Sequence, residues 1–479
     1  MKVIRSNEKL MPDYRRVIAK KFTIDNPDRE KRIVERLLTK SPVEVDKLLK
    51  EVFDRFKDRH RDVERIFKDN FNIVSHYVDQ ETSLKQKLLI GSYFTMEYSV
   101  ESAALFNPSI VPHPVQSGTE EGELRVIVSF RAVGEGHISS ITFRQGIIHE
   151  DGSISIGENN CLIEQSNIRT STLYSKKEFV LSLKEADLEE KAKPILDELI
   201  SHFSRKELDD AIQKYEVSSK ERSRNKIIDT MNLLASTNYS MEFHSQTDIS
   251  SRVIFPVSKS ERKGLEDARF VCFQDASEQR RMYYATYTAF NGSAIIPQLI
   301  ETRDFIHFTV SSLHGNAAKN KGMAIFPEKI GGRYAMLSRL DNENIYVVFS
   351  DNIKMWENPS LIAIPHEDWE LIQLGNCGSP IKTDEGWLVL THGVGPVRSY
   401  FLGAMLLDLE DPTKVLGTLK KPLMSPNEEE RSGYVPNVLY SCGSVIHNGW
   451  LVIPYAMSDS FSSFAKVKVT DLLKELKKN

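Results

Sequence analysis

Two adjacent carboxylates and an arginine make one short stretch of this sequence suited to chemistry, Gly264-Leu265-Glu266-Asp267-Ala268-Arg269-Phe270. An apolar run follows it, as at the start of a buried strand. Successive side chains of a strand point to opposite faces, so Asp267 and Arg269 should share a face and Glu266 should point away. An acid beside a fixed cation suits proton transfer near an anionic group. The alternative is a charged turn closed by a weak surface ion pair.

The sequence around this stretch has a β pattern. Short apolar runs continue from Tyr239 to Val469, with polar turns between them, and helical spacing is nearly absent there. Many short strands with regular punctuation indicate a sandwich, a barrel or a propeller. Comparable turn–strand pairs recur roughly every 45–55 residues, which is typical of a four-stranded propeller blade.

Two other segments have helical periodicity. In the first, Ser41-Pro42-Val43-Glu44 has the spacing of a capping box with proline at the first helical position. An inserted helix must bury its apolar face, so we predict that residues 25–105 and 178–236 pack together. The predicted units are a tail and helical domain at 1–105, the first β part at 106–177, the helical insertion at 178–236, and the remaining β part with a C-terminal helix at 237–479.

Composition argues against several classes of protein. The net charge is −4, and the β half has no block of like charges, so neither nucleic acid nor an anionic membrane is expected as a partner. The cysteines form no CxxC pair, so we expect neither a metal site nor a disulfide framework. Reduced thiols and the lack of a long apolar segment predict a cytoplasmic protein. The four cysteines are Cys161, Cys272, Cys377 and Cys442.

The heptapeptide at 264–270 resembles the signature of glycoside hydrolase family 130, which usually reads Gly-x-Glu-Asp-Pro/Ala-Arg. The resemblance implies a mainly β fold, a five-bladed β-propeller, to which the N-terminal region and the insertion add an α-helical domain. Further segments resemble family motifs in the expected order: Phe106-Asn107-Pro108, Phe130-Arg131-Ala132, Thr286-Tyr287-Thr288-Ala289, Asn320-Lys321-Gly322, Ser338-Arg339, Gly375-Asn376-Cys377, Thr391-His392-Gly393 and Tyr455-Ala456-Met457-Ser458-Asp459.

The resemblance implies an enzyme that cleaves β-mannosidic linkages with inversion. In the family's phosphorylases the aspartate that matches Asp267 is the proton donor, thought to act through a sugar hydroxyl, and inorganic phosphate is the nucleophile. The expected product is mannose 1-phosphate, the expected co-substrate is phosphate with no further cofactor, and a homo-oligomer is allowed. Cations suit phosphate, so the predicted phosphate ligands are Arg131, Arg269, Lys321, Arg339 and His392. The predicted sugar contacts are Asn107, Tyr287, Asn376 and Asp459.

Some segments depart from the phosphorylase pattern, notably Ser338-Arg339 and Asn320-Lys321-Gly322. An inverting β-1,2-mannosidase is therefore an alternative, in which Glu301 or Glu343 would activate water. A glycan-binding propeller without catalysis and glycosyl transfer between sugars also stay open. Phosphorolysis is preferred because the cations of the predicted phosphate site are present.

Overall fold

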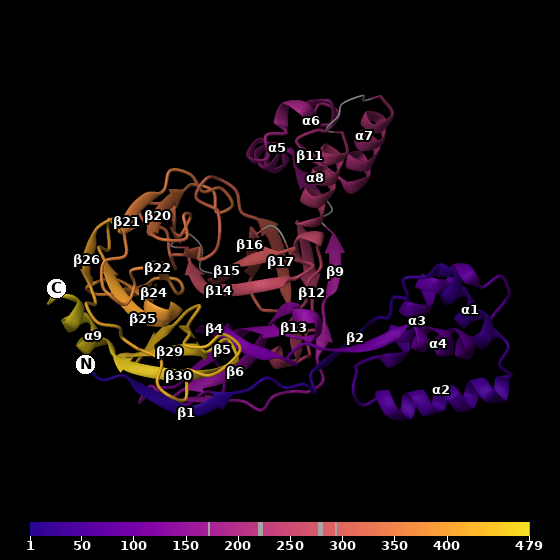
Figure 1. Ribbon diagram of the computed structural model, residues 1–479, viewed down its shortest axis with the longest axis horizontal. Coiled ribbons are helices and arrows are strands. Elements are labelled where there is room, and N and C mark those ends of the chain that lie inside the picture. The colour runs from indigo at the N-terminus through magenta and orange to yellow at the C-terminus, as the bar shows by residue number, and fades with distance from the viewer. Residues whose placement is uncertain (171–172, 219–223, 276–280, 293–294, 479) are drawn as a thin grey trace.

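The computed structural model describes residues 1–170, 173–218, 224–275, 281–292 and 295–478. Figure 1 shows a β body from which two helical units project at separate places. The N-terminal unit lies at the right of the view, and the insertion lies at the top. Among the described residues, no helix is both long and apolar enough to cross a membrane. The chain is mainly β, as predicted, and most of its helices belong to the two units.

The N-terminal helical unit has a hydrophobic core of its own. Helix α2 begins as predicted, because Ser41 and Glu44 form a reciprocal capping box and Pro42 takes the first helical position. The apolar stripes of the helices meet around Phe67 and Leu89. The elements of the unit are β2 (Val17–Lys21), α1 (Pro27–Leu38), α2 (Pro42–Phe56), α3 (Val63–Val74), η1 (Ser75–Tyr77), α4 (Leu84–Tyr93) and β3 (Thr95–Ser99), which pairs with β2.

The insertion also closes on itself. Its core surrounds Phe179, Phe203 and Met231. The prediction that it packs on the N-terminal helices is wrong, because the two cores share no residue and Figure 1 shows the units apart. Each unit has enough amphipathic helices to bury its apolar faces internally. The elements of the insertion are β10 (Tyr174–Ser175), α5 (Lys176–Glu185), α6 (Glu189–Leu196), β11 (His202–Phe203), α7 (Arg205–Ser218) and α8 (Arg224–Ser236).

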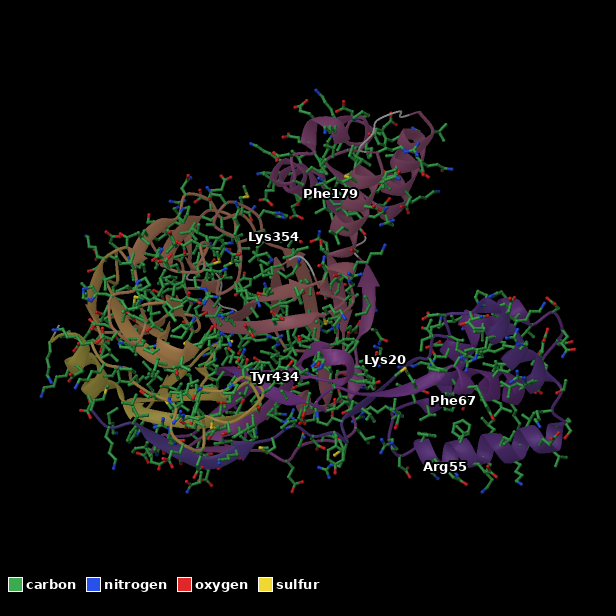
Figure 2. All side chains as sticks on the ribbon, viewed as in Figure 1. Lys20, Arg55, Phe67, Phe179, Lys354 and Tyr434 are labelled. Atoms are coloured by element: carbon green, nitrogen blue, oxygen red, sulfur yellow. The ribbon has the colours of Figure 1, made fainter. Side chains whose placement is uncertain are left out.

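Polar contacts join the insertion to the β body near Lys354, which is labelled at this junction in Figure 2. The Lys354 ammonium lies 3.3 Å from the Glu178 carboxylate. The backbone N–H of Gly315 donates to Glu185 at 2.5 Å, and Ser182 contacts the His314 ring at 3.2 Å. These contacts hold one face of α5 along its length against the loops that follow β17 and β20.

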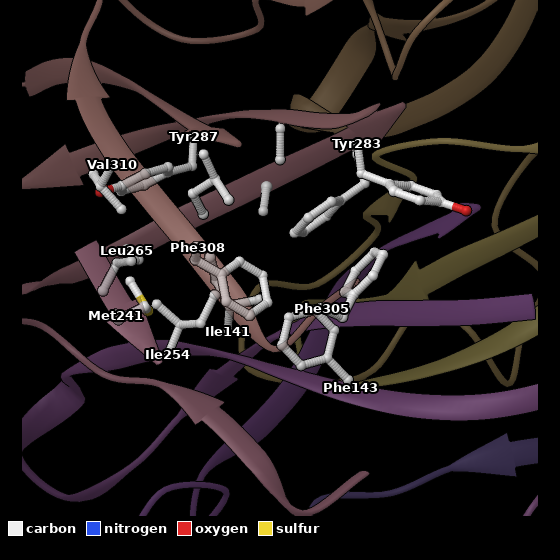
Figure 3. Packing of buried hydrophobic residues seen from close by; sticks show 14 of the residues in the cluster. Ile141, Phe143, Met241, Ile254, Leu265, Tyr283, Tyr287, Phe305, Phe308 and Val310 are labelled. Carbon is white, nitrogen blue, oxygen red and sulfur yellow. The ribbon is translucent and has the colours of Figure 1, made fainter. Parts of the chain in front are cut away.

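The largest sheet has the strand order β4-β5-β6-β14-β15-β16-β17-β12-β9, and β7, β8 and β13 pair at its side. Strands β6 and β14 are joined through one parallel pair, Ser139 with Gly264, so two antiparallel parts meet there. A Cβ at Gly264 would overlap the Ser139 hydroxyl, and its φ of +135° also favours glycine. Figure 3 shows the core between these strands, where Phe143 and Phe305 meet edge to face. The bounds are β4 (Ala104–Pro112), β5 (Leu124–Val133), β6 (Ser139–Ile148), β7 (Ile154–Ile156), β8 (Glu164–Gln165), β9 (Asn167–Thr170), β12 (Tyr239–Glu242), β13 (Arg252–Ile254), β14 (Gly264–Gln274), β15 (Arg281–Phe290), β16 (Ile295–Thr302) and β17 (His307–Ser312).

Within the described residues, three further sheets complete the β body. One has the order β18-β19-β20-β21, and the next has the order β22-β24-β25-β26 with β23 beside β24. The last joins the two ends of the chain, because β1 pairs with β30 in the order β1-β30-β29-β27, with β28 beside β29. The bounds are β18 (Ala324–Ile325), β19 (Tyr334–Ser338), β20 (Ile345–Ser350), β21 (Ser360–Ala363), β22 (Gln373–Asn376), β23 (Ile381–Thr383), β24 (Gly386–Val394), β25 (Tyr400–Leu407), β26 (Val415–Thr418), β27 (Leu439–Tyr440), β28 (Val445–His447), β29 (Trp450–Met457), β30 (Phe461–Lys468), β1 (Ile4–Leu10) and α9 (Val469–Leu476), with short 3₁₀ turns η2 (Glu135–His137), η3 (Ile249–Ser251), η4 (Lys259–Glu261) and η5 (Pro396–Arg398).

Candidate active site

A β-bulge in β14 places both carboxylates of the signature at one point. The register between β14 and β15 shifts between Glu266 and Arg269, and Asp267 has a left-handed backbone with φ of +56°. Such a backbone costs roughly 1–3 kcal/mol in a non-glycine residue and persists only where its surroundings hold it. The expectation that Glu266 points away from Asp267 is wrong, because the bulge breaks the strict alternation of the strand.

Cations bridge the two buried acids. Arg131 lies 2.6 Å from the Glu266 carboxylate and 3.4 Å from the Asp267 carboxylate. The Lys321 ammonium lies 2.5 Å from the second oxygen of Glu266. Asn107, which also has a positive φ, donates its side-chain amide to Asp267 Oδ1 at 2.7 Å. We call these five side chains the acid cluster.

The charge balance of the acid cluster keeps Asp267 ionised. Burial alone would raise the pKa of Asp267, but the positive charges of Arg131, Arg269 and Lys321 outweigh burial and lower it to about 2. The hydrogen bond from Asn107 acts in the same direction. Asp267 is therefore a carboxylate at neutral pH when no ligand is bound.

Hydrogen bonds from Arg269 hold the backbone of the bulge in place. Arg269 is fully buried, and its guanidinium donates to the backbone carbonyl of Asp267 at 2.9 Å and to that of Cys377 at 2.8 Å. A third donor reaches the Tyr440 hydroxyl at 2.8 Å. These bonds favour a positioning role for Arg269 over the phosphate contact that we predicted from the sequence.

A second cationic group lies beside the acid cluster. Arg339 donates to Nε2 of the fully buried His392 at 2.8 Å. Burial, Arg339 and Arg269 hold the pKa of His392 well below its ordinary value, so the ring is neutral and accepts this bond. The Tyr440 ring lies 4.8 Å from the His392 ring and connects this group with Arg269. His392 therefore fixes the direction in which the Arg339 fork points.

Several buried polar atoms of the site have no hydrogen-bond partner in the described structure. They include Nε of Arg131, Nε of Arg339 and Oδ1 of Asn376. The side-chain amide of Asn376 donates to the Gly322 carbonyl at 2.8 Å, which ties it to the loop that carries Lys321. A buried donor without a partner costs about 1–3 kcal/mol, so a ligand with acceptor oxygens would relieve this cost.

Asp459 adds a third carboxylate from the turn between β29 and β30. Burial and the negative charge of Asp267 raise the pKa of Asp459 to about 6, against the opposing charges of Arg131 and Arg398. Its backbone is also left-handed, with φ of +51°. Asp459 therefore lies close enough to interact with the charges of the acid cluster, as expected of a residue of the sugar site.

Three residues predicted for the site lie elsewhere in the described structure, namely Glu301, Glu343 and Tyr287. Glu301 on β16 lies near Lys354 and Glu178, at the junction with the insertion. Burial raises its pKa there, and its charged neighbours belong to that junction and not to the acid cluster, so its position shows that the prediction that it activates water at the site is wrong. Glu343 is exposed in the turn after β19, where its backbone contacts are with Asp341 and Leu374.

Tyr287 is a core residue, so its predicted role as a sugar contact is wrong. Only 2% of it is exposed, within the cluster of Figure 3. Its hydroxyl donates to Glu261 at 2.5 Å, and the Tyr239 hydroxyl donates to the same carboxylate. Alternation along β15 explains the error, because Thr286, the residue before it, faces the loop with Met323.

Sequence reasoning missed Tyr440 and Arg398 and misplaced Glu266. No motif marked Tyr440, whose hydroxyl holds Arg269. Arg398 lies 5.6 Å above the Tyr400 ring and has a positive φ. The preceding Gly395-Pro396 turn was the signal that this loop returns toward the site.

Comparison with known proteins agrees with this site. A family model described as beta-1,4-mannooligosaccharide phosphorylase, of glycoside hydrolase family 130, matches residues 220–478. The match contains Asp267, Lys321, Arg339, His392 and Asp459 but leaves out Asn107 and Arg131, which come from the first β part.

Relatives of known activity align over a large share of their own length. A 1,2-beta-oligomannan phosphorylase from Thermoanaerobacter sp. (strain X514) is 34% identical over 221 residues, which span 45% of this chain and 72% of that protein. A beta-1,2-mannobiose phosphorylase from Listeria innocua is 30% identical over 283 residues, which span 56% of this chain and 77% of that protein.

Among solved structures, the complex of the Listeria innocua beta-1,2-mannobiose phosphorylase with beta-1,2-mannobiose aligns at 20% identity with a TM-score of 0.46. The alignment covers 80% of this chain and 94% of that one. Since the family model matches more than half of the sequence and includes the buried acid with most of its cations, this chain belongs to glycoside hydrolase family 130.

Proposed function

We propose that this enzyme cleaves β-mannosidic linkages by phosphorolysis, with inversion, and releases mannose 1-phosphate. The observation that carries the proposal is the acid cluster, in which Arg131 and Lys321 flank the buried pair Glu266 and Asp267. Relatives of this chain are named as phosphorylases of β-1,2-linked mannosides, which supports the same substrate class.

The proposed nucleophile is inorganic phosphate, bound by Arg131, Lys321 and Arg339. In the described part of the chain, Arg131 and Arg339 each have a buried Nε without a hydrogen-bond partner, and forked guanidinium donors suit phosphate oxygens. A phosphate oxygen attacks C1 of the mannosyl ring from the face opposite the glycosidic oxygen. The C1–O bond breaks, and inorganic phosphate is the only co-substrate that this step requires.

The proposed acid is Asp267, which supplies a proton to the leaving oxygen through a sugar hydroxyl. With a pKa of about 2 it cannot donate in the free enzyme at neutral pH. A phosphate anion beside Arg131 and Lys321 would offset their positive charge, and a nearby negative charge raises the pKa of an acid. Phosphate binding and burial of the sugar therefore both favour the protonated form of Asp267.

The mannosyl ring is proposed to bind between Asn107, Asn376 and Asp459. All three carry oxygen or nitrogen atoms suited to sugar hydroxyls, and Asn376 Oδ1 is buried with no hydrogen-bond partner among the described residues. Hydrolysis is less well supported, because a glutamate would have to activate water and Glu301 lies at the insertion junction instead.

The proposed fold for this chemistry is a five-bladed β-propeller. Its blades would be the two parts of the largest sheet, the two sheets β18–β21 and β22–β26, and the sheet that pairs β1 with β30. Pairing of the first strand with the last would close such a ring. We also propose a cytoplasmic location, which the four free cysteines support.

The test is to incubate the enzyme with β-1,2- and β-1,4-mannobiose, with and without phosphate, and to separate the products. Mannose 1-phosphate that forms only with phosphate supports the proposal. Free mannose released at the same rate without phosphate would overturn phosphorolysis in favour of hydrolysis.

A further inference from the structure

Two exposed aromatic rings stand together on loops next to the acid cluster. His137 and Tyr434 stack with ring centroids 6.0 Å apart and an angle of 27° between their planes. Tyr434 is 68% exposed, and Figure 2 shows it on the β body, away from both helical units. We call these two residues the rim pair. Exposed aromatic rings lose contact with water only when something covers them, so this pair is a candidate binding surface.

The backbone connects the rim pair directly to the site. His137 lies in η2, the turn that follows β5 shortly after Arg131. The Tyr434 N–H donates to the Ser460 hydroxyl at 2.8 Å, and the next N–H, of Val435, donates to the Ser458 carbonyl at 3.0 Å. Ser458 and Ser460 flank Asp459. His137 therefore extends from the turn that follows the strand of Arg131, and Tyr434 extends from a loop that is hydrogen-bonded to the turn of Asp459.

The backbones of both loops are held firmly. His137 has a positive φ of 58°, a conformation that persists only where the surroundings enforce it. A Cβ at Gly433 would lie 2.5 Å from the Ser460 hydroxyl, so the loop before Tyr434 packs tightly on the Asp459 turn. The Ser458 hydroxyl in turn donates to the Glu430 carbonyl at 2.6 Å. A rigid aromatic surface loses little conformational entropy when a ligand covers it.

We propose that the rim pair is a platform for the leaving-group sugar of the mannoside chain. This inference rests on the proposed function. Cleavage occurs at the buried Asp267, so the rest of the substrate must extend outward from it toward solvent. The C–H face of a pyranose can cover an aromatic ring, while its hydroxyls stay in contact with water. The platform would raise affinity for oligosaccharides of two or more sugars without touching phosphate.

The experiment compares Tyr434→Ala and His137→Ala with wild type. As the matched control, Tyr14→Ala removes a 75% exposed tyrosine between β1 and β2. We expect the KM for β-1,2-mannotriose to rise about tenfold in both rim variants, with kcat and the KM for phosphate little changed, because a stacking contact is worth about one power of ten in affinity. Tyr434→Phe should behave as wild type. A KM for mannotriose that matches the Tyr14→Ala control in both rim variants would overturn the platform.

Calorimetry separates this proposal from the proposed function. Titration of Asp267→Asn with β-1,2-mannotriose measures binding without turnover, and the same titration is repeated with Tyr434→Ala added. If wild type forms no mannose 1-phosphate but binding still weakens about tenfold on loss of Tyr434, the platform stands and phosphorolysis falls. If Asp267→Asn binds no mannotriose, or binds it equally with and without Tyr434, the platform falls.

Discussion

Two buried carboxylates lie close together in the chain, and their partners differ in kind. Glu261 accepts hydrogen bonds from the Tyr239 and Tyr287 hydroxyls and from the N–H groups of Val257 and Ser258. Asp267 faces cations instead, and among the described residues the Nε of one of these cations, Arg131, has no hydrogen-bond partner.

The difference separates structural burial from functional burial. Neutral donors surround Glu261 and satisfy both its oxygens, so this carboxylate holds the core and offers nothing to a ligand. Neutral residues could pack around Asp267 as well as the charged ones do, so packing alone does not explain the surplus of positive charge there. This positive charge is expected if an anion binds in the site during the reaction.

Removing the functional acid should have the largest effect on activity. Asp267→Asn should lower kcat/KM about 10³-fold, because general acid catalysis contributes on that order. The variant should keep its far-ultraviolet circular dichroism spectrum. Steady-state phosphorolysis of β-1,2-mannobiose measures the effect, and a variant that keeps a tenth of wild-type activity would contradict the role of Asp267 as proton donor.

Removing a cation that has a free donor should act on phosphate alone. Arg339→Ala should raise the KM for phosphate about 10- to 100-fold and leave the KM for mannobiose nearly unchanged, because charged hydrogen bonds contribute about 1.5–3 kcal/mol. Arg333→Ala removes an exposed arginine directly before β19, whereas Arg339 directly follows that strand, and it is the matched control. If mannobiose binding weakens instead, Arg339 belongs to the sugar site.

The structural acid should show the reverse behaviour. Glu261→Gln keeps one oxygen to accept from the N–H groups of Val257 and Ser258, but its NH2 group can no longer accept from the Tyr239 and Tyr287 hydroxyls, so the free energy of unfolding should fall by about 1–3 kcal/mol. The kcat of the folded fraction should stay within about threefold, because Glu261 lies in the core rather than among the cations. Urea unfolding and activity assays on the same sample test this. Lost activity with unchanged stability would break the comparison between the two acids.

Asp459 should give the smallest effect, a pH-dependent change in stability. Its pKa of about 6 in the folded protein lies above the ordinary value of 3.8, so its protonated form stabilises the fold below pH 3.8 and this contribution is lost as the pH rises through 6. Asp459→Asn should therefore be more stable than wild type by about 1–2 kcal/mol at pH 8, with no such gain at pH 4. Urea unfolding at the two pH values measures this, and an equal gain at both would contradict the raised pKa.

The sequence predicted well what depends on local pattern. The capping box at Ser41 and the mainly β character of the remaining chain follow from residue type and spacing, and the structure has both. Whether the two helical units pack on each other could not be predicted in this way, and the prediction that they do is wrong. Apolar stripes show that a helix needs a partner, but both units find partners within themselves.

The sequence predicted which residues form the candidate site better than it predicted how they are arranged. Asp267, Arg131 and Lys321 converge, although they come from distant parts of the chain. The bulge at Asp267 was not predictable from alternation, because a left-handed residue inside a strand follows from tertiary contacts. Tyr287 was assigned to the site because it is an aromatic residue in a segment that resembles a family motif, but its side chain lies in the core.

The most direct test of the account is the initial rate of β-1,2-mannobiose cleavage as a function of phosphate concentration, followed by ³¹P nuclear magnetic resonance. The cations around Asp267 should make cleavage depend on phosphate, so the rate should rise hyperbolically from zero and each cleavage should yield one mannose 1-phosphate. A rate that is already maximal without phosphate, with no new phosphorus signal when phosphate is added, would contradict the account.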